Sequence, residues 1–213
     1  MGNIIQIENL CKFFGKTEVL HNISVNFEQG KIHGLIGRNG SGKTILLKCI
    51  CAMIPITSGT IKVGGKQIGK DTDIPESVGV IIETPGFLPE YSAYKNLRFL
   101  ADISGGVSRE TIEQAIRKVG LDPKDKKRVG KYSLGMRQRL GLAQAIMEDP
   151  QLLILDEPMN GLDKQGVADM RKYLLDLKAK AKTILIASHS AEDIEVLCDT
   201  VHEMERGHIQ KIR

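Results

Sequence analysis

The chain has 213 residues, of which 41% are hydrophobic and 26% charged, and its formal net charge is +4 at pH 7. This composition is typical of a globular protein, and the length predicts one domain, or one domain with an inserted subdomain. With no Trp and no run of interleaved basic and aromatic residues, we expect no nucleic-acid partner. We also expect no membrane-spanning helix, because no apolar run approaches about 20 residues. We expect no secretory signal, because the N-terminus MGNIIQIENL has no basic region followed by an apolar stretch.

The predicted elements begin as strands and then alternate between strands and helices. Apolar and polar residues alternate in 23–27, which is the pattern of a half-buried strand. Apolar residues recur at helical spacing from 91 to 147. In chain order, we expect strands at 4–10, 23–27 and 32–36, a helix at 43–53, two short strands around Gly65, a strand at 78–82, helices within 91–147, a strand at 152–155, a helix at 165–179, a strand at 183–187, a helix at 191–197, and a hairpin at 201–212.

This order has a helical stretch at about 86–150, with strands and helices alternating before and after it. Alternating strands and helices favour a largely parallel sheet with helices packed on its faces. The sequence therefore predicts an α/β fold that carries a helical subdomain at about 86–150 as an insertion.

A glycine-rich segment, GRNGSGKT at 37–44, matches the phosphate-loop pattern G-x-x-x-x-G-K-[ST] at every position. It follows one predicted strand and opens a predicted helix, where backbone N–H groups and the helix N-terminus converge on phosphate oxygens. Lys43 is expected to meet the β- and γ-phosphates, and the Thr44 hydroxyl to bind Mg²⁺. The predicted nucleotide-binding residues of this loop are Gly37, Arg38, Asn39, Gly40, Ser41, Gly42, Lys43 and Thr44.

Two acidic residues follow a later apolar strand. The sequence LLILDE at 152–157 places Asp156 at the carboxyl end of a buried strand, with Glu157 directly after it. A carboxylate in that place can hold Mg²⁺ through water. Glu157 is expected to polarise the attacking water as a general base. Together with the phosphate loop, these residues predict a nucleotide-hydrolysing enzyme.

Further motifs indicate the kind of hydrolase. The segment SLGMR at 133–137 resembles the signature motif LSGGQ of ATP-binding cassette (ABC) proteins, with Ser133 and Gly135 retained and Met136 in place of Gln. The segment NGLD, which ends at Asp163, resembles the D-loop of that family. His189, in the segment ASHS after the last core strand, matches its switch histidine.

The resemblance to ABC ATPase domains covers essentially the whole chain, 1–213. It implies a phosphate-loop NTPase core with an antiparallel β subdomain and a helical subdomain. It also implies that two such domains dimerise head to tail, with each ATP between the phosphate loop of one and Ser133, Gly135 and Met136 of the other, and Asp163 nearby. Phe14 matches the position that stacks on adenine, and the adjacent Phe13 competes for that assignment.

One departure from the family pattern lies at Glu83, where most members have Gln. A carboxylate can still offer an oxygen to Mg²⁺, but it donates no hydrogen bond when ionised. We therefore count Glu83 with Thr44 and Asp156 as a candidate metal ligand, and Glu157 with His189 as the catalytic residues. Our hypothesis is that Glu83 links the nucleotide state to a membrane partner and is not the hydrolytic base.

This Glu and the neighbouring motifs resemble the ATPase subunits of lantibiotic-immunity and bacitracin-resistance exporters. That resemblance implies an ATP- and Mg²⁺-dependent ATPase on the cytoplasmic face of the cell membrane, which powers export through a separately encoded permease. The alternative is a soluble ABC ATPase that acts on ribosomes or DNA. It is disfavoured because such proteins usually carry two cassettes or long coiled-coil insertions, and the sequence has neither.

Overall fold

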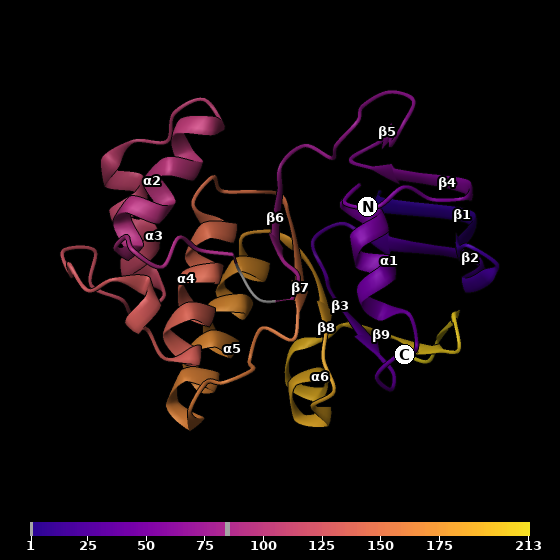
Figure 1. Cartoon of the computed structure of the whole chain (residues 1–213). Helices are drawn as coiled ribbons and strands as arrows, with labels where there is room; N and C mark the ends of the chain where they lie inside the picture. The colour runs from indigo at the N-terminus through magenta and orange to yellow at the C-terminus, as the bar shows by residue number, and fades with distance from the viewer. Residues whose placement is uncertain (1, 84–85) are drawn as a thin grey trace.

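The strands form two β-sheets, the smaller at the right of Figure 1 and the larger through the middle of the molecule. The computed structural model describes residues 2–83 and 86–213. The smaller sheet is antiparallel, with strand order β2-β1-β4-β5, and the larger has the order β10-β9-β3-β8-β7-β6. The strands are β1 (Asn3–Phe14), β2 (Thr17–Glu28), β3 (Ile32–Ile36), β4 (Ser58–Val63), β5 (Lys66–Gln67), β6 (Val78–Ile81), β7 (Leu152–Asp156), β8 (Thr183–Ala187), β9 (Thr200–Glu205) and β10 (His208–Lys211).

The larger sheet is parallel except at one edge, where β10 runs antiparallel to β9. Its central strands β3, β7 and β8 are buried almost throughout. Continuous apolar runs such as LLIL and TILIA are typical of parallel strands covered on both faces. The predicted α/β class is therefore confirmed, and so is the antiparallel β part.

Helices surround this sheet, and most of them begin with a side-chain cap. Ser92, Ser108, Ser133, Asp163 and Ser190 each accept a hydrogen bond from the backbone N–H three residues further on, which satisfies one of the free N–H groups of a first turn. The helices are α1 (Lys43–Ile50), α2 (Ala93–Ile103), α3 (Arg109–Lys118), α4 (Leu134–Ile146), α5 (Lys164–Ala179) and α6 (Ala191–Leu197), with a 3-10 turn at Val129–Lys131.

The core has two parts, one on each face of the parallel sheet. Successive residues of β7 alternate between them: Leu153 and Leu155 pack with α2 to α6, whereas Leu152 and Ile154 pack with α1 and the antiparallel sheet. This alternation follows from the two-residue period of a strand. The sheet therefore joins the two halves of the molecule that are seen on either side of it in Figure 1.

The structure extends some predicted elements and shortens others. The strands expected at 4–10 and 23–27 are longer, because the residues between them also pair across the turn at Gly15. The helix expected at 43–53 ends at Ile50, since Ala52 has a φ of +58° that a right-handed helix does not allow. α2, α3 and α4 lie within the expected insertion at 86–150, whose bounds remain a prediction.

Within residues 2–83 and 86–213, no helix has the length and apolar composition needed to cross a membrane.

Two histidines are buried where β3 and β9 lie side by side. His33 forms hydrogen bonds to Thr200 Oγ1 (2.7 Å) and to the carbonyl oxygen of Glu28 (2.8 Å). His202 is 3% exposed and packs edge-on against Phe27. Burial lowers the pKa of His33. Burial, with smaller contributions from the nearby His33 and Lys211 side chains, lowers the pKa of His202 to about 4. Both rings are therefore neutral in the folded protein at pH 7.

We expect acid to destabilise the fold through His202. Its pKa is lower in the folded chain than in the unfolded one, so between pH 6.5 and pH 4 the unfolded chain binds more protons and stability falls as the pH falls. The free energy of unfolding should drop by about 2 kcal/mol from pH 7 to pH 5 through this group. Urea titrations at both pH values measure this, and His202→Leu is the control. An equally steep loss in His202→Leu would contradict the assignment.

Candidate functional site

The glycine-rich segment forms a tight loop between β3 and α1. Gly37 has a φ of +146°, and a Cβ there would lie 2.2 Å from the carbonyl oxygen of Met204. Gly42 has a φ of +108° and precedes α1 without a capping side chain. Only glycine fits these two backbone positions without strain. The loop therefore turns sharply and leaves the N–H groups of the first turn of α1 free for a ligand.

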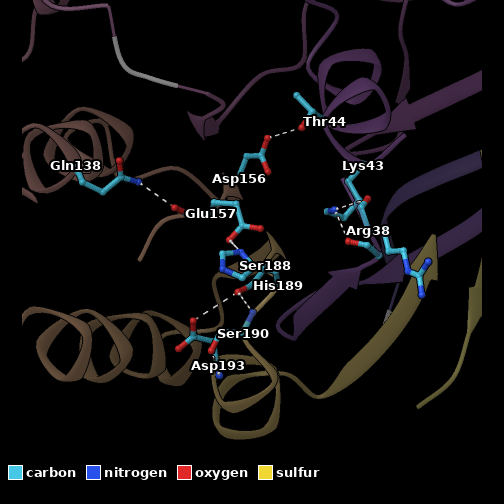
Figure 2. A network of polar contacts seen from close by, with 11 residues as sticks. Arg38, Lys43, Thr44, Gln138, Asp156, Glu157, Ser188, His189, Ser190 and Asp193 are labelled. Carbon is cyan, nitrogen blue, oxygen red and sulfur yellow. Dashed lines mark hydrogen bonds and ion pairs between the residues drawn. The ribbon is translucent and has the colours of Figure 1, made fainter. Parts of the chain in front are cut away.

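The loop has the chemical character of a phosphate site. The Nζ atom of Lys43 donates to the carbonyl oxygens of Gly37 (2.7 Å) and Arg38 (3.3 Å), so its ammonium group lies within the loop (Figure 2). Ser41 Oγ is buried and has no hydrogen-bond partner among the described residues. The first turn of α1, which the structure describes in full, has no acidic side chain. A free N-terminus, a cation and an unpaired hydroxyl together fit a polyphosphate.

Thr44 and Asp156 meet at the start of α1. The Thr44 hydroxyl donates to Asp156 Oδ2 at 2.7 Å, although the two residues are 112 positions apart in the chain. Burial raises the pKa of Asp156, and Glu157 and Glu83 raise it further, while the Thr44 hydrogen bond and Lys43 lower it. A hydroxyl and a carboxylate beside a phosphate loop are suitable ligands for Mg²⁺, which usually takes one or two carboxylates together with substrate phosphates.

Glu157 lies directly against His189. Glu157 Oε2 and His189 Nδ1 are 2.8 Å apart, and Figure 2 shows the pair between Asp156 and the loop that follows β8. Glu157 has a φ of +48°, an unusual value for a residue with a side chain. Its N–H donates to the carbonyl oxygen of Ala187 at 2.9 Å. The fold thus brings the two expected catalytic residues together, although their catalytic roles remain predictions.

Glu83 lies beside a residue that the sequence analysis did not identify. Its Oε1 atom is 2.7 Å from Lys48 Nζ, on α1 one turn beyond Thr44. The Glu83 side chain is 63% exposed, and its backbone φ is +58°. Its carboxylate is therefore paired with an ammonium group in this structure, while its negative charge is still felt at Asp156. A role of Glu83 as a metal ligand remains a prediction.

The signature segment packs against the D-loop of its own chain. Ser133 caps α4 by accepting a hydrogen bond from the N–H of Met136 at 3.2 Å. A Cβ at Gly135 would lie 2.7 Å from the carbonyl oxygen of Gly161, so only glycine allows this close approach. Asp163 caps α5 through the N–H of Gly166. In Figure 1, α4 and α1 lie on opposite sides of β7. The signature segment, at the start of α4, is therefore separated from the phosphate loop, at the start of α1, of the same chain.

Both candidates for the adenine platform lie near the end of β1. The Phe14 side chain is more exposed than that of Phe13, at 48% against 38%. Lys12 Nζ lies over the Phe14 ring, 4.8 Å from its centroid. Consecutive strand residues face opposite sides of a sheet, so only one of the two rings can face a given ligand. The assignment to Phe14 remains a prediction.

The sequence analysis also did not identify several polar residues that contact the site. Gln138 Nε2 donates to the backbone oxygen of Glu157 at 3.4 Å, which supports a residue with an unusual φ. Arg171 and Asp193 form a partly buried ion pair next to the His189 loop. Helical spacing from Thr44 could have indicated Lys48, because residues four apart share a helix face. The other contacts join distant segments and leave no local pattern in the sequence.

Comparison with known proteins places these features in one family. Residues 20–160 match the family model described as "ABC transporter". An uncharacterized ABC transporter ATP-binding protein of Bacillus subtilis, YybJ, is 47% identical over 97% of this chain and 95% of its own. The bacitracin transport ATP-binding protein BcrA of Enterococcus faecalis is 43% identical over 98% of this chain and 68% of its own. The lantibiotic transport ATP-binding protein SrtF of Streptococcus pyogenes is 39% identical over 97% of this chain and 89% of its own.

The fold is also that of a solved ATP-binding cassette. The dimeric structure of the cassette MJ0796 in a post-hydrolysis state, bound to ADP and Pi, superposes with a TM-score of 0.86. The similarity covers 98% of this chain and 99% of that one, at 19% identity, and it concerns the fold. The family match, the near-full-length identities and the shared fold show that the chain belongs to the ABC transporter family, as an ATP-binding subunit that hydrolyses ATP.

Proposed function

We propose that this subunit powers the export of peptide antibiotics of the bacitracin or lantibiotic class. The observation that carries the proposal is the similarity to BcrA and SrtF, at 43% and 39% identity over nearly the whole chain. The permease would be a separately encoded membrane protein, and the subunit would bind it at the cytoplasmic face of the membrane. Glu83, which replaces the usual Gln, supports the same assignment.

The residues of the site support the following division of roles. Backbone N–H groups of the loop and the Lys43 ammonium would hold the phosphates of ATP. Thr44 and Asp156 would hold Mg²⁺, which when bound neutralises charge on the β- and γ-phosphates. Glu157 would accept a proton from the attacking water, and His189, 2.8 Å from its carboxylate, would orient it toward the γ-phosphate.

A head-to-tail dimer would complete each site. The signature residues Ser133, Gly135 and Met136 sit at the N-terminus of α4, on the other side of β7 from α1. Their hydroxyl and N–H groups can therefore serve the nucleotide of a second subunit more readily than their own. Phe14 would stack on adenine at the other end of the same nucleotide, and Asp163 would lie between the two subunits.

An exposed apolar surface on the helical part is the proposed binding surface for the permease. Tyr91 and Phe99 stack edge-on, 5.1 Å between ring centroids, and Leu88 and Ile103 are also exposed. Phe99 and Ile103 are one turn apart on α2, and Leu88 and Tyr91 precede this helix. Exposed apolar side chains that gather on a surface commonly mark an interaction site. This surface follows Glu83 in the chain, which suits the hypothesis that Glu83 reports the nucleotide state to the permease.

The test of the proposed cargo begins with capture of the partner. Glu157→Gln purified from native membranes with ATP should retain a small polytopic membrane protein, identified by mass spectrometry. A strain lacking this gene should become more sensitive to bacitracin or to a lantibiotic, and the wild-type gene should restore resistance while Lys43→Ala should not. Recovery of ribosomes or DNA-bound proteins instead, with unchanged sensitivity, would contradict the export proposal.

We predict that Glu157→Gln binds ATP but hydrolyses it very slowly. The amide keeps the shape of the carboxylate and cannot accept the proton of water, so kcat should fall at least about 100-fold. ATP affinity should change little, because the phosphate loop is untouched. Phosphate release and equilibrium nucleotide binding measure the two quantities. Hydrolysis within a few-fold of the wild type would show that Glu157 is not the base.

We predict a different result for Glu83→Gln. Its pairing with Lys48 is exposed, and exposed ion pairs are worth about 1 kcal/mol or less, so basal ATPase activity should stay within about 5-fold. Transport by the complete exporter should change, because the residue linked to the permease has lost its charge.

The matched control for Glu83→Gln is Lys48→Gln, which removes the other partner of the ion pair. If Glu83 acts through its own carboxylate, Lys48→Gln should affect transport less than Glu83→Gln does. Vesicle transport and ATPase assays on the same preparations measure both effects. Complete loss of hydrolysis in Glu83→Gln would make Glu83 part of the catalytic machinery and would refute the hypothesis.

A further inference from the structure

An ion pair joins the helix after the D-loop to the helix after the His189 loop. Arg171, on α5, directs Nε to Asp193 Oδ1 at 2.7 Å, and Nη2 contacts the same oxygen at 2.5 Å. The Asp193 side chain, on α6, is only 4% exposed, and that of Arg171 is 16% exposed. The two residues are 22 positions apart, so the contact is tertiary. This ion pair links α5 to α6.

The same carboxylate also reaches the loop that carries His189. Asp193 Oδ2 lies 3.5 Å from Ser188 Oγ, and Ser188 Oγ accepts the N–H of Ser190 at 3.1 Å. Ser190 Oγ in turn accepts the N–H of Asp193. Asp193 and the serines on either side of His189 therefore form one closed set of hydrogen bonds, seen in Figure 2.

His189 itself has few restraints of its own. Its side chain is 70% exposed, and its recorded polar contact is with Glu157. Its position therefore depends on the Glu157 contact and on the backbone of Ser188 and Ser190. A cavity of about 560 Å³, lined by D-loop residues and by Arg171, Ser188, His189 and Asp193, opens beside it and leaves the ring room to move. Anything that loosens Ser188 or Ser190 would thus displace the imidazole from Glu157.

We propose that Arg171 and Asp193 are positioning residues for ATP hydrolysis. They hold the loop that carries His189 so that its imidazole stays against Glu157, and they connect this loop to α5, the helix that follows the D-loop. Arg171 holds Oδ1 of Asp193 with two N–H groups, which leaves Oδ2 to accept from the Ser188 hydroxyl. Ser188 Oγ in turn accepts the N–H of Ser190. This inference uses the ATPase activity of the family and the proposed role of His189, and it is independent of the exported cargo.

The test compares Asp193→Asn with the wild type in the full chain. We expect kcat for ATP to fall roughly 10-fold or more, since small misplacements of a catalytic group are costly, while KM changes less than about 3-fold. Amide hydrogen exchange at 188–190 should speed up, with no change at 37–44. Glu192→Gln is the matched control, because it removes only the exposed side of the Arg171 contact, where Glu192 is 73% exposed, and it should behave like the wild type.

A second pair of variants separates positioning from stability. Arg171→Met combined with Asp193→Leu removes both buried charges, which an apolar pair often replaces without loss of stability. We expect a thermal midpoint close to that of the wild type and a kcat that stays low. Arg171→Lys keeps the positive charge but cannot place two N–H groups of one rigid plane on Asp193, so we expect an intermediate kcat. If Asp193→Asn does not fold, the kcat of Arg171→Lys tests the proposal in its place.

Two results for the Arg171 and Asp193 variants would overturn the proposal. One is a kcat that recovers together with the thermal midpoint in the double variant, which would make the pair merely structural. The other is a fall in kcat and ATP affinity together, which would place the defect in nucleotide binding. His189→Ala serves as the reference: if it hydrolyses ATP normally, the role of His189 is wrong and the proposal fails with it, whereas the export proposal is tested separately by antibiotic sensitivity.

Discussion

The site depends on the parallel pairing of β3, β8 and β7. Because parallel strands end at the same edge of a sheet, the segments that follow them are forced together. Asp156 pairs with Ala187, and Leu35 pairs with the same residue from the other side. Two further backbone hydrogen bonds extend the register beyond the strands, from Glu157 to Ala187 and from Ser188 to Leu35. The phosphate loop, the acidic pair and the His189 loop thus meet through backbone geometry before any side chain is considered.

The side chains then refine what the sheet brings together. The Thr44–Asp156 contact ties the phosphate helix to β7, and the Glu157–His189 contact ties β7 to the loop after β8. The Arg171–Asp193 ion pair adds a third link, between α5 and α6, which pack on the same face of the sheet. Each link joins neighbouring elements, so polar contacts run from the phosphate loop to the helix that follows the D-loop.

Much of this could be predicted from the sequence, because the informative signals are local. The residues of a phosphate loop are consecutive, a buried parallel strand is a short apolar run, and most helices start at a capping side chain. The strands at 152–156 and 183–187 were placed correctly to within one residue for this reason. The ends of β1 and β2 were not, since their outer residues do not alternate between apolar and polar and pair only because the facing strand is present.

The contacts that the sequence could not reveal are tertiary and polar. Lys48 and Glu83 are 35 positions apart, and Gln138 and Glu157 are 19 apart. Nothing in either pair distinguishes it from the other charged and amide residues of the chain. The positive φ of Glu157 is equally invisible, because it is imposed by the loop that turns back from β7 and not by the residue itself.

The separation of the signature from the phosphate loop has a genetic consequence. In the head-to-tail dimer proposed above, a chain with these two surfaces on opposite sides of β7 would lend half of its chemistry to its neighbour. A copy damaged at either surface would still assemble with an intact copy, and it would spoil a site that the intact copy cannot complete alone. We expect such an allele to be dominant over the normal gene, and one that prevents folding to be recessive.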